Sequence, residues 1–457
     1  MQKAKHIGLL LVFILMSSLF SACSSSSTEN NAIPTPSQNS QPQSNNENVS
    51  NNSTPESKEP VSKEPVKLKW ALWDWDATVY YQPLIDAYVT KNPNVTIEYT
   101  DLGASDYMTL LSTQLSGGAD FDVLTMKDIP GYANLVRQNF LEPLNGYIAS
   151  SGIDTSLYGG VIEQITVNNE VYELPFRSDF WLIYYNKDLF DEVNIAYPTN
   201  DMTIDEYDAL ARKLTRGTGA DKVYGAHYHT WRSTVQLFGI LDGKHTIVDG
   251  TYDFLKPYYE RVLKQQNDGI VMDYATLVTT STHYRGAFFN NQIATLNMGT
   301  WLIATQIDAV KSGESLATNW GVVKYPHPDG VQAGTTLGTI TAVAVNSNSK
   351  NKDAALDFIK FVSGSEGAAV MASIGQFPAI MNDTVVDLIT SIDGYPQDAN
   401  SKEALKTTKV YLEFPLHEKS AEIEVILNEE HANILTGDVT LDEGIENMNS
   451  RVQDALK

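Results

Sequence analysis

Alternating apolar and polar residues mark the start of a folded body at residue 67. Leu68, Trp70 and Leu72 recur at every second position, and this period predicts a strand. A helical pattern follows and ends at 92–94. Strands are then expected at 95–99 and 121–126, with a helix between them at 107–115. Alternation of strands with helices predicts an α/β fold with a mainly parallel sheet that carries helices on its faces.

The most apolar and aromatic segment lies at 180–185, inside the longer stretch 173–190. Its composition predicts a strand in a buried sheet. Arg177 and Asp179 come just before it and are expected at the rim of a core. Two interpretations are open there. The pair either belongs to a ligand site or forms a surface ion pair on a solvated turn.

The rest of the chain continues the same mixture of elements. Thr203-x-x-Glu206 is a capping box that predicts a helix start. Further strands are expected at 320–325 and 339–345, and a helix at 353–363. Two amphipathic helices are expected at the end, one over 420–435 and one that starts from a second capping box, Thr440-x-x-Glu443.

The residues after the first three predicted strands suit the recognition of a polyhydroxylated ring. In sheets of this kind ligands bind beyond the carboxyl ends of the strands. Aromatic rings stack on the C–H face of a sugar, and carboxylate or ammonium groups bond its hydroxyls. The alternative is that these are ordinary loop residues and that Trp73 caps the core. The candidates are Trp73, Trp75, Asp76, Asp101, Lys127 and Asp128.

A second group of candidates lies at 226–232. A His227-x-His229 pair on a strand would place both rings on one face, but no third ligand of suitable spacing stands nearby, so no metal site is expected. His229, Trp231 and Arg232 are candidate ligand contacts, with structural packing as the alternative. Farther on, Gly299 allows a close approach of the chain, and Trp301 follows it at a helix start.

Length and charge limit the possible functions. The chain has 457 residues, which predicts two domains, and 42% hydrophobic residues are enough for real cores. Acidic residues outnumber basic ones 56 to 32, and the formal net charge is −24. Nucleic acid and anionic membrane surfaces both require a basic face. They are therefore not expected as partners.

The N-terminal 66 residues are expected to lie outside the folded body. Residues 1–22 have the pattern of a secretory signal peptide, and the sole cysteine, Cys23, follows Ser21-Ala22. This site resembles the cleavage site of bacterial lipoproteins, which implies a lipidated, palmitate-bearing Cys23 as the new N-terminus. A plain secretory signal with an incidental cysteine is the alternative. Residues 23–66 are predicted to be the lipid anchor and a disordered tether, because 24–66 contain almost no large apolar residues.

Five short motifs occur in a fixed order along 67–457, and together they resemble the extracellular solute-binding proteins of bacterial ABC importers. The similarity is to the sugar-binding branch that includes maltose-binding proteins. The motifs are FLEPL at 140–144; LPF at 174–176 with YNKDLF at 185–190; GAFF at 286–289 with GTW at 299–301; 352–367 ending in SEG; and GQFPA at 375–379.

The resemblance implies a two-lobed, periplasmic-binding-protein-like (type II) fold with a ligand cleft between the lobes. The N-terminal lobe would comprise 67–182 plus 318–383, and the C-terminal lobe 183–317 plus 384–457. Arg177 and Asp179 would lie near the hinge, and Trp301 would offer a stacking platform, with Tyr411 or Phe414 as a second one. The opposite wall would carry Trp75, Asp76, Lys127 and Asp128.

The expected function is that of a membrane-anchored, extracytoplasmic substrate-binding component of an ABC importer. It would capture an oligosaccharide by hinge closure and deliver it to the permease, as a monomer without cofactor or metal. One alternative is an extracellular carbohydrate-active enzyme, which needs two carboxylates across the scissile bond. Nothing in the sequence supplies such a pair, so no enzyme activity is expected. Another alternative is a sugar sensor or adhesin with the same fold.

Overall fold

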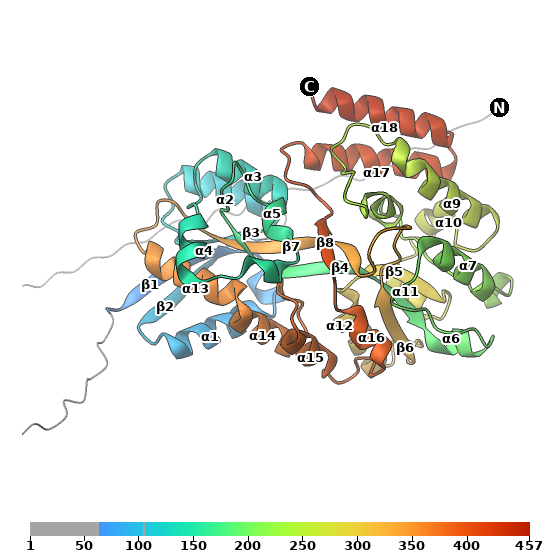
Figure 1. The fold of residues 1–457 in the computed structure, drawn as a ribbon, viewed down its shortest axis with the longest axis horizontal. Coiled ribbons are helices and arrows are strands. Elements are labelled where there is room, and N and C mark those ends of the chain that lie inside the picture. The colour runs from blue at the N-terminus through green and yellow to red at the C-terminus, as the bar shows by residue number, and fades with distance from the viewer. Residues whose placement is uncertain (1–63, 104–105) are drawn as a thin grey trace, which may run out of the picture. The chain divides into compact units, whose positions relative to one another are not determined.

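The computed structural model describes residues 64–457 apart from 104–105 (Figure 1). The predicted signal peptide, Cys23 and all but the last three residues of the predicted tether lie outside the described residues. Within the described part, no helix is both long and apolar enough to cross a membrane.

The described residues form eight strands, in chain order β1 (Val66–Leu72), β2 (Val95–Asp101), β3 (Val123–Met126), β4 (Leu174–Asn186), β5 (Thr295–Gly299), β6 (Trp320–Lys324), β7 (Thr335–Val345) and β8 (Lys409–Leu412).

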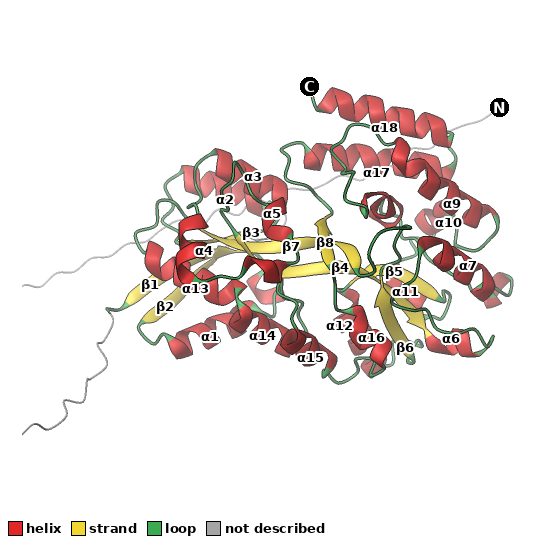
Figure 2. Ribbon diagram, viewed as in Figure 1, coloured by secondary structure: helices red, strands yellow, loops and turns green. Residues whose placement is uncertain are grey.

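The α-helices fall between and after these strands (Figure 2). They are α1 (Tyr81–Lys91), α2 (Tyr107–Ser116), α3 (Ile129–Arg137), α4 (Asn145–Ser151), α5 (Val161–Gln164), α6 (Lys187–Asp191), α7 (Ile204–Leu214), α8 (Ser233–Gln236), α9 (Lys256–Asn267), α10 (Tyr274–Thr279), α11 (Tyr284–Phe289), α12 (Leu302–Ser312), α13 (Lys352–Ser363), α14 (Ser365–Ser373), α15 (Asp383–Thr390), α16 (Ala399–Ala404), α17 (Ser420–Thr436) and α18 (Leu441–Ala455). Short 3₁₀ turns are η1 (Trp75–Ala77), η2 (Thr155–Tyr158), η3 (Gly219–Asp221), η4 (Leu237–Ile240) and η5 (Asp253–Leu255).

Strand order confirms an α/β fold but corrects the expectation of a mainly parallel sheet. The main path is β2-β1-β3-β7-β4-β5. Only β1 with β2, β1 with β3, and β7 with β8 pair in parallel. The pairings of β7 with β3 and β4, and of β4 with β5 and β6, are antiparallel. The sheet is mixed because β4 and β7, its two longest strands, do not belong to the strand–helix–strand units that the first part of the chain predicted.

β4 takes part in two different sheets, and this places the apolar segment 180–185 at a crossing. Its first half, up to Phe180, pairs with β7 beside the strands of the first sheet. From Trp181 onwards it pairs with β5 and β6. All residues from Phe180 to Asn186 are buried, as predicted for a strand inside the core.

The helices cover both faces of the first sheet. Figure 1 shows α2 and α3 on one side of β1, β3 and β7, and α1 and α14 on the other. Their apolar sides, such as Leu84 of α1 and Leu111 of α2, are fully buried. The element bounds confirm the predicted helix at 107–115 and the predicted strands at 95–99 and 121–126, with ends shifted by one or two residues.

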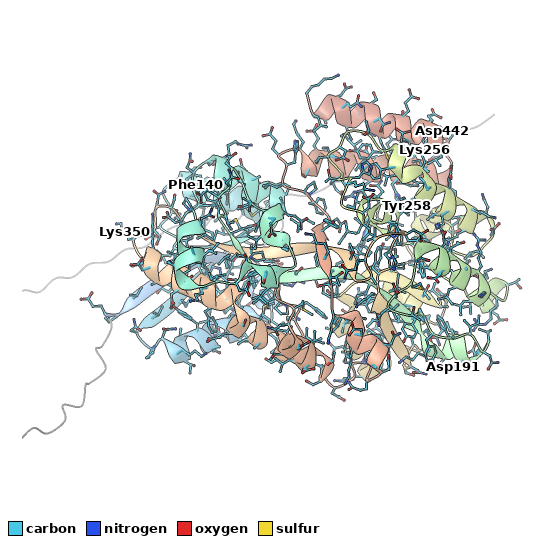
Figure 3. The ribbon with its side chains drawn as sticks, viewed as in Figure 1. Phe140, Asp191, Lys256, Tyr258, Lys350 and Asp442 are labelled. Atoms are coloured by element: carbon cyan, nitrogen blue, oxygen red, sulfur yellow. The ribbon has the colours of Figure 1, made fainter. Side chains whose placement is uncertain are left out.

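The second helical group contains α7, α9, α10, α17 and α18. α17 and α18 pack side by side, and Lys256 at the start of α9 forms an ion pair with Asp442 in the first turn of α18, at 3.0 Å (Figure 3). The capping box of α7 forms as predicted, with both reciprocal bonds between Thr203 and Glu206. The Thr440 hydroxyl caps α18 by accepting from the backbone N–H of Glu443.

The lobe boundaries stay a prediction. Strand pairing bears on one of them, the place where the chain passes back from the second sheet to the first. β6 pairs with residues 182–186 of β4, the half of that strand that belongs to the second sheet. β7 pairs with β3 and with the first half of β4. A lobe boundary between β6 and β7 therefore fits this pairing better than the predicted boundary at residue 318.

Candidate functional site

The Arg177–Asp179 pair is built into β4 directly before the crossing. The Arg177 Nη2 and Asp179 Oδ2 atoms are 2.5 Å apart, and the Asp179 side chain is only 5% exposed. The other carboxylate oxygen, Oδ1, accepts a hydrogen bond from the Thr300 hydroxyl at 2.8 Å. The pair is therefore a buried contact between β4 and the segment after β5, and not an ion pair on a solvated turn.

A cavity of about 370 Å³ lies against residues 338–340 of β7, which pair with residues 178–180 of β4 just before the crossing. Its floor is formed by β7 and the end of β8, and its sides come from the start of α3 and from α17. Two of the predicted site residues, Lys127 and Asp128, line it, as does the predicted platform Phe414. The full lining is Lys127, Asp128, Ile129, Pro130, Gly338, Thr339, Ile340, Leu412, Phe414, Ala421 and Glu424.

A larger cavity of about 550 Å³ lies elsewhere, between α1 and the α13–α14 junction. Its lining includes Lys91, Lys360 and Glu366 but none of the predicted site residues. We place the candidate site at the smaller cavity because residues from four separate parts of the chain converge there, among them the predicted Lys127, Asp128 and Phe414.

The first wall of the site comes from the ends of β1 and β3. The Lys127 ammonium lies 5.8 Å from the centre of the Trp73 ring, and the edge of that ring packs on Tyr107. Asp128 caps α3, because its Oδ1 accepts from the Gly131 N–H at 2.7 Å. The carboxylate is exposed and remains able to accept further donors.

Trp75 and Asp76 occupy the η1 turn. The Trp75 ring stacks on Tyr99 at 3.7 Å between ring centres, so one of its two faces is already covered. Asp76 is exposed. Neither residue is among the described residues that line the cavity. A stacking role for Trp75 would have to use its edge or its second face, which lies parallel to Tyr81 at 6.0 Å.

An aromatic cluster that is not part of the cavity lining surrounds Trp301. Trp231 is 38% exposed, and its ring centre lies 6.4 Å from that of Trp301. The edge of Trp301 in turn packs on Trp181 of β4. Gly299 permits this arrangement, because an added Cβ would come within 2.0 Å of the Trp301 ring. Tyr284 packs edge-on to Trp231 at 5.7 Å, and the sequence motifs did not include this residue.

The histidines of 226–232 lie in an irregular segment, which corrects the prediction of a strand there. The two ring centres are nevertheless only 6.2 Å apart. Burial, followed by the charge of neighbouring histidines, lowers the pKa of His227 to about 3 and that of His229 to about 4. Both rings are neutral at physiological pH. Among the described residues no group of three or more His, Cys, Asp or Glu side chains is placed to hold a metal ion.

Arg232 is fully buried, behind the cavity wall. Its guanidinium forms an ion pair with Glu424 of α17 and lies 5.7 Å from the centre of the Phe414 ring. Glu424 is the member of this pair that lines the cavity. No sequence motif pointed to Glu424, because it looks like any exposed acid of an amphipathic helix. Which of the site residues contact a ligand stays a prediction.

A mixed sheet in which one long strand, β4, passes from one group of strands to another, with a cavity against its neighbour β7, is typical of a two-lobed binding protein. The model of the family described as "Bacterial extracellular solute-binding protein" matches residues 74–369. This is well over half of the chain, and the protein belongs to that family. The resemblance drawn from the five motifs is thereby confirmed.

Individual relatives agree with this assignment. A sugar transporter from Rhizobium etli, solved in an open conformation, is 56% identical, with a TM-score of 0.83 and coverage of 85% of this chain and 99% of that one. The sugar-binding protein MalE from Xanthomonas citri shares the fold, with a TM-score of 0.70, 19% identity and coverage of 85% and 97%. The lactose-binding protein of Rhizobium radiobacter is 23% identical over 303 residues, 63% of this chain and 68% of the relative.

Proposed function

We propose that the protein is the membrane-anchored substrate-binding component of an ABC importer and that it captures a neutral oligosaccharide. One observation carries the proposal. The cavity is lined by the polar groups of Lys127, Asp128 and Glu424 together with the Phe414 ring. The aromatic cluster of Trp231 and Trp301 adjoins this lining through Arg232, which follows Trp231 in the chain and pairs with Glu424. Aromatic faces combined with charged hydrogen-bonding groups suit a sugar ring. The 56% identity to a sugar transporter supports the same ligand class.

The charges around the site favour a ligand without acidic groups. Arg177 is paired with Asp179, and Arg232 is paired with Glu424. A phosphate or carboxylate ligand would have to compete with these carboxylates for both guanidinium groups. A neutral hydroxyl can instead donate to an acceptor that is already paired. This argument points to an uncharged sugar.

Capture would occur by closure of one lobe onto the other. β4 continues from the first sheet into the second, and the cavity lies against the part of β7 that pairs with it. A bound sugar that contacts both walls would favour the closed state over the open one. The closed form would then dock on the permease. The protein would act as a monomer held at the outer face of the membrane through Cys23.

A thermal-denaturation screen against neutral sugars tests ligand capture, because a ligand that binds only the folded state raises Tm. Lactose, maltose and maltotriose form a first panel. At least one is expected to raise Tm and to be recovered unchanged after long incubation. New products would instead indicate a carbohydrate-active enzyme, and no shift with any sugar would contradict the proposal.

Two experiments in cells test anchoring and transport. Cys23→Ser is expected to release the protein from the membrane fraction without loss of sugar binding. Deletion of the protein is expected to abolish uptake of the sugar that binds. Intact uptake after deletion would favour a sensor or adhesin with this fold.

A further inference from the structure

Glu424 stands out among the residues that line the cavity because the protein fixes its carboxylate from two sides. Its Oε2 atom accepts from the Nε of the buried Arg232. Its Oε1 atom accepts from the Asn428 Nδ2 at 2.8 Å. Asn428 is itself held, since its Oδ1 accepts from the backbone N–H of Arg232 at 3.2 Å.

Arg232 is in turn fixed by the second helical group. Its Nη1 donates to the Gln236 Oε1 at 3.4 Å, and Gln236 donates to the Tyr259 hydroxyl at 2.8 Å. Phe414 covers the guanidinium on the cavity side, with its ring centre at 5.7 Å. The guanidinium, 0% exposed, therefore orients Glu424 without reaching the cavity itself.

The Glu424 carboxylate retains capacity for one more donor. A carboxylate oxygen has two lone pairs, and only one lone pair of Oε1 is used by Asn428. The side chain is 24% exposed and lines the cavity. The surrounding lining is largely apolar, with Ile129, Ile340 and Leu412. An acceptor of fixed direction in an apolar wall discriminates strongly between ligands that do and do not offer a hydrogen at that point.

We infer that Glu424 is a specificity-determining residue: it accepts a hydrogen bond from one hydroxyl of the bound sugar, and Arg232 acts through it as a positioning residue. This inference rests on the proposed function. It predicts that the protein rejects the acidic form of its sugar, because a carboxylate at that place offers no hydrogen and meets the Glu424 oxygens with like charge. Arg177, Asp179 and the Trp231–Trp301 pair are not required for this discrimination.

The test compares two Glu→Gln substitutions on the same helix, α17. Glu424→Gln changes the cavity carboxylate. Glu430→Gln is the matched control, because Glu430 is also buried and ion-paired, at 2.6 Å from Arg451, but lies away from the cavity. Both variants are expected to lower Tm, because Glu424→Gln removes the ion-pair partner of Arg232 and Glu430→Gln removes one of the two partners of Arg451, the other being Glu429. Only Glu424→Gln is expected to weaken sugar binding, about ten- to hundredfold.

Calorimetry with lactose, maltose and maltotriose first establishes which sugar the unmodified protein binds. Its monodeoxy derivatives then identify the hydroxyl involved. One derivative is expected to bind the unmodified protein about ten- to hundredfold more weakly, yet to bind Glu424→Gln as well as the parent sugar does. A general loss of structure would weaken the binding of all derivatives alike. It would not remove the difference between one derivative and the parent sugar. The corresponding uronic acid is expected to gain affinity, relative to the neutral sugar, in Glu424→Gln.

The outcomes separate the inference from the proposed function. Sugar binding that is unchanged in Glu424→Gln, or weakened equally in Glu430→Gln, overturns the role of Glu424 and leaves the proposed function intact. The role of Glu424 is also overturned if every deoxy derivative loses the same affinity, relative to the parent sugar, in Glu424→Gln as in the unmodified protein. Failure of all three sugars to bind the unmodified protein contradicts the proposed function, and the inference falls with it.

Discussion

At the scale of single residues, the acidic side chains near the cavity differ in how their charge is compensated. Asp179 and Glu424 each have a basic partner. Glu173, directly before β4, is fully buried, and neither of its carboxylate oxygens has a hydrogen-bond partner. Burial, with a smaller contribution from the charge of Asp128, raises the pKa of Glu173 well above its ordinary value of 4.5.

The raised pKa of Glu173 predicts a pH-dependent stability. The folded protein keeps a proton on Glu173 that the unfolded chain releases near pH 4.5. The contribution is therefore fully present below that pH and is lost as the pH rises toward the folded pKa. Glu173→Gln, which cannot ionise, is expected to become increasingly more stable than the unmodified protein above pH 4.5. Urea denaturation across pH measures this, and a difference that does not change with pH would contradict it.

Removal of the Trp301 ring is expected to weaken ligand binding. This ring lies between Trp181 of the core and the exposed Trp231. Trp301→Ala is expected to cost about 1–3 kcal/mol of sugar affinity if the ring stacks on the ligand. Trp301→Phe keeps a stacking face and should lose less. Unchanged affinity of Trp301→Ala in calorimetry would remove this residue from the site.

Residue types in the sequence indicated the chemistry of the site but not which members face the cavity. Lys127 and Asp128 were found because they directly follow a predicted strand. Arg232 was also predicted as a contact, yet it is buried and presents Glu424 instead. Whether Arg232 or Glu424 faces the cavity depends on packing between two segments almost 200 positions apart, and no local pattern encodes this.

At the scale of elements, β4 organises the site because it is one unbroken strand in two sheets. Its apolar, aromatic composition predicted a buried strand, and its burial confirms this. Local patterns also predicted several of the longer helices, such as α7, whose capping box forms in full. The antiparallel pairings of β7 were not predictable, because they join segments that are distant in sequence and leave no periodic signal of their own.

The junction from β5 to α12 offers a test of how the aromatic cluster is positioned. Gly299→Ala would place a Cβ within 2.0 Å of the Trp301 ring, and the ring would have to move. The variant is expected to lose about 1–3 kcal/mol of stability and to bind sugar more weakly. Gly286→Ala is the control, because its added Cβ meets no atom within 4 Å. Equal behaviour of the two variants in denaturation and calorimetry would contradict the proposed positioning.

At the scale of the whole molecule, the proposed closure depends on the one strand, β4, that joins the two sheets. β7, which pairs with the first half of β4, forms part of the cavity floor, and in the proposed closure a change where β4 crosses would alter the distance between α3 and α17. Membership of the extracellular solute-binding family is consistent with such a motion. The five motifs predicted the family, but the details of the cavity required the structure.

Closure on sugar binding is the central claim, and a fluorescence distance measurement tests it most directly. Cys23 is the only cysteine, so Cys23→Ser provides a background for labelling Gln138→Cys beside α3 and Glu422→Cys on α17, both at exposed positions. The sugar that binds in calorimetry is expected to raise energy transfer between the two dyes, with a midpoint equal to its Kd. Binding without any change in energy transfer would contradict capture by closure.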